Sequence, residues 1–150
     1  MRFTLASLAV FAFALALSAA PIPKAKPKDE DTIVGIWQVD AIDFGPGVPA
    51  PPVDFKQMRF EFKAGGKMAM TMGDMPANES EFKLDPAAKV KAIDIGNGRV
   101  SPGIYELDGD NLKICLAEGT NTVRPTKMKP EAMRITVITF KRVKVEKKDK

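Results

Sequence analysis

Residues 57–63 show the clearest pattern along the chain, an alternation of apolar and polar side chains. Met58, Phe60 and Phe62 are separated by single charged residues. Successive side chains of a β-strand point to opposite faces, so this period of two predicts a strand with one dry and one wet face. The glycine pair at 65–66 then supplies a turn, and the next segment is expected to pair back as a hairpin.

The second half of this hairpin, residues 67–72, alternates in the same way and places Met68, Met70 and Met72 on one face. Further strands are predicted at 34–42, 79–84, 90–95, 103–107, 111–117 and 134–143, separated by turns rich in glycine, proline and aspartate. No segment has a convincing helical period. Short strands at near-regular spacing predict an all-β fold, an antiparallel up-and-down barrel of about eight strands.

A barrel of this size is either filled by its own side chains or has room for one small ligand. The residues predicted to line the interior, and so to bind a ligand, are Met58, Phe60, Phe62, Met68, Met70, Met72, Phe82, Ile104, Leu112 and Ile114. The leading functional hypothesis is that this lining holds a small apolar or amphipathic molecule. The alternative is a structural or protein-interaction module with a filled barrel, whose protein partner the sequence does not identify.

The N-terminal segment predicts export. Residues 1–19 have a basic residue at position 2, continue without charge and end in small residues, as a cleavable signal peptide does. The alternative is a retained membrane anchor, for which the uncharged run is only marginally long enough. Residues 20–32 are rich in proline and lysine and are predicted to be a flexible tether, so that structure begins near Ile33. The domain is expected over 33–143 and a charged tail over 144–150. After cleavage the protein would have no integral membrane span. It would be located in the periplasm, in the cell envelope or outside the cell.

The net charge of +4 comes from the C-terminal end of the chain. Residues 141–150 carry six positive and two negative side chains, whereas 32–140 carry thirteen positive and fourteen negative ones. The predicted domain is therefore not basic, and a nucleic-acid partner is not expected. The single cysteine, Cys115, cannot form an internal disulfide and lies in an apolar run typical of a buried thiol.

The composition argues against an enzyme. The chain has no histidine, so neither a Ser-His-Asp triad nor a histidine-activated cysteine can form. Gly45-Pro46-Gly47 lacks the lysine and helix of a phosphate-binding loop, and the segment 108–111 lacks the remaining ligands of a calcium loop. We predict no catalytic residues, no cofactor and no metal site among the usual ligand types.

The methionine row at 68, 70 and 72 leaves a third hypothesis open, a carrier of Cu(I), because thioethers are soft ligands that favour this ion. Side chains two apart on a strand are separated by about 7 Å, so one strand cannot surround an ion. A partner strand, for example one carrying Met58, would have to supply another sulfur. The simpler interpretation is a flexible apolar lining.

Gly35-Ile36-Trp37 opens the first predicted strand and Arg142 lies on the last. The glycine lets another part of the backbone approach closely, and the guanidinium of Arg142 is expected to lie on the indole face of Trp37 and close the barrel. Gly35, Trp37 and Arg142 are therefore predicted to be structural.

This arrangement resembles the lipocalin signature, and the chain as a whole resembles an uncharacterised lipocalin-like domain family of exported planctomycete proteins. The segments that carry the resemblance are Gly35-Ile36-Trp37, 91–95, 103–116 and Arg124-Pro125-Thr126, within 33–143. The resemblance implies a lipocalin-like barrel and an envelope location. It implies no particular activity.

Overall fold

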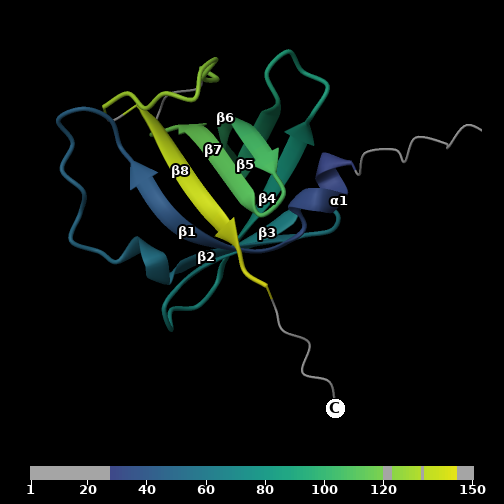
Figure 1. Cartoon of the computed structure of the whole chain (residues 1–150), viewed down its shortest axis with the longest axis horizontal. Coiled ribbons are helices and arrows are strands. Elements are labelled where there is room, and N and C mark those ends of the chain that lie inside the picture. Colours follow the sequence, from purple (N-terminus) through teal and green to yellow (C-terminus); the bar gives the residue numbers. More distant parts are fainter. Residues whose placement is uncertain (1–27, 120–122, 133, 145–150) are drawn as a thin grey trace, which may run out of the picture.

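The computed structural model describes residues 28–119, 123–132 and 134–144 (Figure 1). Almost all of the regular structure is β. The elements in chain order are α1 Asp29–Ile33, β1 Gly35–Asp43, the 3-10 turn η1 Phe55–Gln57, β2 Met58–Lys63, β3 Lys67–Met72, β4 Asn78–Asp85, β5 Ala92–Asn97, β6 Arg99–Asp108, β7 Asn111–Ala117 and β8 Ile135–Arg142.

The eight strands form a closed barrel in which each strand pairs with its sequence neighbours. All pairs are antiparallel, and β8 returns to β1, where Trp37 lies opposite Arg142 and Ile42 opposite Ile138. A bulge between Val39 and Ala41 keeps the apolar positions of β1 on the inner face on both sides of the irregularity. The predicted antiparallel up-and-down barrel is confirmed.

The strand register gathers the large apolar side chains inside. Phe60 lies opposite both Trp37 and Met70, and Phe62 lies opposite Met68. Aromatic rings fill the gaps by edge-to-face packing: Phe60 contacts Phe140 and Phe62 contacts Phe82, with ring centroids 5.0 Å and 4.9 Å apart. The polar partners in the alternation point to solvent, as the period of two predicts.

The strand that was predicted over 103–107 is longer in the structure. β6 starts at Arg99 and includes Pro102, which lies opposite Asp94 on β5. Proline lacks the backbone N–H and so removes one hydrogen bond between the strands, but it does not prevent the pairing. The strand was therefore predicted to start after Pro102, although it begins before it. A single positive-φ glycine, Gly98, completes the tight turn between β5 and β6.

The expectation that 20–32 is a tether and that structure begins near Ile33 is wrong for its last residues. Residues Asp29–Ile33 form α1, whose final residue, Ile33, is fully buried at the end of the barrel where β1 begins. A single helical turn is too short to show a period in the sequence. Contacts with residues far along the chain, described below, hold it in place.

Three predicted segments lie wholly or largely outside the described residues: the signal peptide at 1–19, the tether as far as 27, and the tail from 145. Within the described residues, no helix is long and apolar enough to cross a membrane.

Candidate functional site

The end of the barrel that carries α1 is filled by its own side chains. Trp37, Phe62, Leu112 and Phe140 have no exposed surface. The indole nitrogen of Trp37 donates a hydrogen bond of 2.7 Å to the carbonyl of Ile33 in α1, so the buried polar atom is satisfied and the helix is attached to the core. Most of this half of the interior is packed like a protein core. Leu84 and Leu107, on the same inner face, are half-buried.

Arg142 covers the opening of the barrel at this end. Its guanidinium carbon lies 4.1 Å from the centroid of the Trp37 ring, as the sequence predicted, and the guanidinium donates to the carbonyls of Val34, at 3.0 Å, and Thr32. The predicted role of Gly35 needs correction. A β-carbon there would lie 2.8 Å from a nitrogen of Arg142, so the glycine makes room for a side chain and not for a backbone.

The opposite end of the barrel has an apolar rim, which we define as six half-buried side chains. They are Ile42, Met58, Met70, Met72, Ile95 and Leu116. The register puts them on the inner face: Ile42 is paired with Ile138, and Met70 is paired with Phe60, both of which are buried core residues. The rim is thus the part of the inner apolar surface, away from α1, that solvent reaches.

Nine of the ten residues predicted to line the interior divide between these two regions. Phe60, Phe62, Met68, Phe82, Leu112 and Ile114 are buried and belong to the core. Met58, Met70 and Met72 belong to the rim. Whether any of them binds a ligand stays a prediction, but the geometry leaves only the three methionines within reach of a molecule from solution.

Ile104 was predicted to line the interior, and this is wrong. Its neighbour Tyr105 faces the core, so Ile104 faces outward, paired with Cys115. Both are nevertheless buried, at 2% and 0% exposure, because the loop before β8 covers them. The thiol of Cys115 donates to the carbonyl of Lys127 in that loop at 3.6 Å. Burial raises the pKa of Cys115, which disfavours the reactive thiolate.

Arg124 attaches this covering loop to the barrel. One guanidinium nitrogen donates to the carbonyls of Ile93 and Gly103, at 3.0 and 2.7 Å, and another donates to the carboxylate of Asp94 at 2.7 Å. The sequence singled out Arg124 only through the family resemblance. In the structure Arg124 joins the covering loop to both β5 and β6, so its role is to position the loop.

A cluster of three titratable side chains holds α1 and was missed by sequence reasoning. One carboxylate oxygen of Asp29 accepts hydrogen bonds from Lys91 and from the hydroxyl of Tyr105, both at 2.7 Å. Burial raises the pKa of Asp29, but the hydrogen bonds from Lys91 and Tyr105 outweigh it, so that the net pKa lies below the ordinary value. The same environment, led by burial, raises the pKa of Tyr105.

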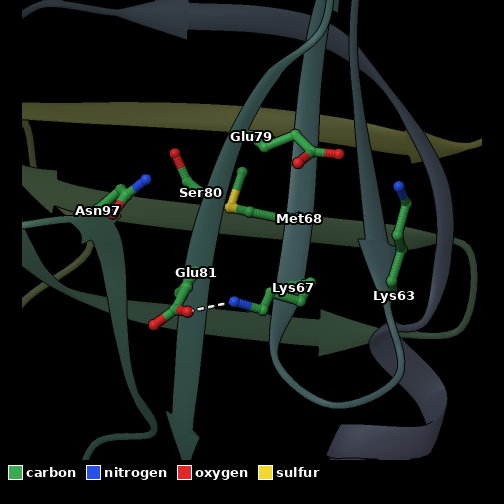
Figure 2. Close-up of a pocket in the computed structure, with 7 residues that line it drawn as sticks. All are labelled: Lys63, Lys67, Met68, Glu79, Ser80, Glu81 and Asn97. Carbon is green, nitrogen blue, oxygen red and sulfur yellow. Dashed lines mark hydrogen bonds and ion pairs between the residues drawn. The ribbon is translucent and has the colours of Figure 1, made fainter.

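A surface hollow of about 400 Å³ lies over β2, β3 and β4 and reaches the end of β5 (Figure 2). Its lining is Lys63, Lys67, Met68, Glu79, Ser80, Glu81 and Asn97. Lys67 and Glu81 form an ion pair across the two strands, and the hydrogen bond from Lys67 is the main reason why the pKa of Glu81 is lowered. Both side chains are well exposed, and exposed pairs contribute little to stability or to ligand affinity.

The described residues contain no group of three or more histidine, cysteine, aspartate or glutamate side chains placed to hold a metal ion. The charged contacts described above all join structural elements to one another. Comparison of the chain with protein-family models, with curated proteins and with solved structures found no match. The apolar rim, where inward-facing side chains meet solvent, is therefore the candidate functional site.

Proposed function

We propose that this protein binds one small apolar or amphipathic molecule at the apolar rim of its barrel. The observation that carries the proposal is the contrast between the two ends of the interior. Core residues near α1 such as Trp37 and Phe62 are fully buried, whereas Met58, Met70 and Met72 are only half-buried on the same inner face. The free energy of the system falls when an apolar ligand covers apolar surface that was in contact with water.

Polar side chains next to the rim suit an amphipathic ligand. Asn78 lies opposite Met70 and Ser80 lies opposite Met68, so both polar groups belong to the inner face of β4. Pockets that bind small molecules combine a mostly apolar lining with a few polar groups that orient the ligand. A ligand with an apolar body and one hydrogen-bonding group matches this arrangement.

The proposal is tested by titrating the purified domain with a fluorescent apolar probe, such as cis-parinaric acid. We expect saturable binding, weakened by Met70→Gln, because a polar amide of similar size replaces an apolar contact at the rim. Leu107→Gln is the matched control, since Leu107 is also half-buried against the core but lies on β6 near α1. Equal affinity for the two variants, or no saturable binding by the wild type, would contradict the proposal.

The filled half of the barrel favours a second candidate, a protein-interaction module whose barrel is only a scaffold. The observation behind it is the complete burial of Trp37, Leu112 and Phe140, which leaves them unavailable to a ligand. Native mass spectrometry of protein isolated from its own cells separates the two. A co-purifying small mass supports ligand binding, and a bound protein in its place supports the interaction module.

The proposal includes export to the cell envelope or beyond, supported by the uncharged run and small residues of 1–19. N-terminal sequencing of the exported protein is expected to find a chain that starts near Ala19 or Ala20. A chain that still starts at Met1 outside the cytoplasm would show that no signal peptidase acted on it.

A further inference from the structure

Met58 and Met72 lie directly opposite each other on β2 and β3. Met70 lies two residues before Met72 and therefore on the same inner face. All three are half-buried and belong to the apolar rim. Two paired strands thus bring three thioether sulfurs to one patch of the interior that solvent reaches, which a single strand cannot do.

The spacing allows the three sulfurs to meet at one point. Directly paired side chains have β-carbons about 4.5–5.5 Å apart, and diagonal neighbours such as Met58 and Met70 are about 7–8 Å apart. Methionine is unbranched and has three rotatable bonds, so its sulfur can move toward a shared ligand without a change in the backbone. Half-burial leaves an entry path while neighbouring apolar groups shield most of the site from water.

We propose that the sulfurs of Met58, Met70 and Met72 bind one Cu(I) ion. Thioethers are soft, neutral donors, and soft donors select Cu(I), whereas calcium and magnesium take oxygen ligands and zinc takes nitrogen, thiolate or carboxylate ligands. The only cysteine, Cys115, faces away from the interior beneath the loop that Arg124 holds, so it does not compete for the ion. This inference is independent of the binding of an apolar molecule, although both use the rim.

The test is a titration with Cu(I) under anaerobic, reducing conditions against a chromophoric Cu(I) chelator. The wild type is expected to take one equivalent from the chelator, and the triple variant Met58→Leu, Met70→Leu, Met72→Leu is expected to take none. Met75→Leu is the matched control, because Met75 lies in the turn after β3 and is 57% exposed. It is expected to bind as the wild type does.

Leucine keeps the apolar volume and removes the donor atom, and such exchanges usually cost less than about 1.5 kcal/mol each, so the triple variant is expected to fold. Should it fail to fold, X-ray absorption of Cu(I) added to the wild type provides a second test, with sulfur as the expected neighbouring atom. Nitrogen or oxygen neighbours would overturn the proposal. So would a wild type that takes no copper, or a folded triple variant that still binds one equivalent.

A parallel titration with the apolar probe separates the two proposals. Copper binding by the wild type without saturable probe binding leaves the metal site standing and overturns the binding of an apolar molecule. Absence of copper binding by the wild type, with probe binding intact, overturns the metal site and leaves the binding of an apolar molecule standing.

Discussion

The guanidinium of Arg142 stacks on the indole of Trp37, with 4.1 Å between the guanidinium carbon and the ring centroid. The two residues also lie directly opposite each other, Trp37 on the first strand, β1, and Arg142 on the last strand, β8. The same guanidinium donates to the carbonyl of Val34, which lies between α1 and β1, and to the carbonyl of Thr32 in α1. One side chain therefore joins the closing strand pair to the segment that enters the barrel.

Replacement of Trp37 by alanine is expected to lower the free energy of unfolding by about 3–5 kcal/mol, the usual cost of deleting a large buried aromatic side chain. It also removes the hydrogen bond to Ile33. Urea denaturation followed by far-UV circular dichroism measures the effect. Fluorescence of a fully water-exposed indole in the folded wild type would contradict the buried position on which this prediction depends.

Arg142→Ala is expected to act in the same direction but more weakly, by about 1.5–3 kcal/mol, because it removes hydrogen bonds that involve a charged group. Its neighbour on β8, Lys141, is exposed and provides the control. Lys141→Ala is expected to change stability by no more than about 0.5 kcal/mol, as is usual at the surface. Equal effects of the two substitutions would show that Arg142 contributes no more than an ordinary surface charge.

Gly35→Ala is expected to destabilise the fold for two reasons. Gly35 has a φ of 136°, where a side chain is strained at a cost of about 1–3 kcal/mol, and its new β-carbon would meet Arg142. The guanidinium cannot move aside without losing its contacts with Trp37 and Val34. Gly47→Ala is the control: φ is 77°, with no atom within 4 Å of the added carbon. Thermal denaturation should show a larger loss for Gly35→Ala.

The Asp29 cluster predicts a pH-dependent contribution to stability. The folded-state pKa of Asp29 lies below its ordinary value of 3.8, so the contribution is complete above that pH and is lost as the pH falls through the lower folded-state value. The difference in unfolding free energy between the wild type and Asp29→Asn is therefore expected to be positive near pH 7 and to shrink below about pH 3.8.

Urea denaturation of both proteins from pH 7 to pH 2.5 measures this difference. Asp31→Asn is the matched control, since Asp31 is an exposed residue of the same helix. A difference for Asp29→Asn that stays constant over the whole range would mean that the hydrogen bonds from Lys91 and Tyr105 do not depend on the charge of the carboxylate.

Arg124→Ala is expected to expose Cys115. Without hydrogen bonds to Ile93 and Gly103, the loop loses its attachment to the outer face of the barrel, and the thiol beneath it becomes accessible. The rate of modification by an aromatic disulfide reagent should rise in the folded protein. Lys127→Ala is the control, because the hydrogen bond of the thiol with Lys127 is to the backbone carbonyl, which alanine keeps. An unchanged rate in Arg124→Ala would show that the loop stays in place without these hydrogen bonds of Arg124.

The alternation of apolar and polar residues was enough to predict the barrel. In 57–63 and 67–72 the period of two sets which side chains face inward, and the glycine turn between them sets the pairing of Met58 with Met72. The stack of Arg142 on Trp37 also followed from the sequence, because in an up-and-down barrel the first and last strands must meet. These features depend on neighbouring residues or on closure of the sheet.

What the sequence could not decide depends on contacts across the fold. The run Gly103-Ile104-Tyr105 is apolar on both faces, so alternation could not tell which face is inside; the loop held by Arg124 made the outer face buried as well. Asp29 reaches partners 62 and 76 residues away, and one helical turn carries no pattern that indicates them. The depth of a side chain along the barrel axis is set by all eight strands and their loops together, and for that reason only the tertiary structure separated the buried core near Trp37 from the half-buried rim around Met70.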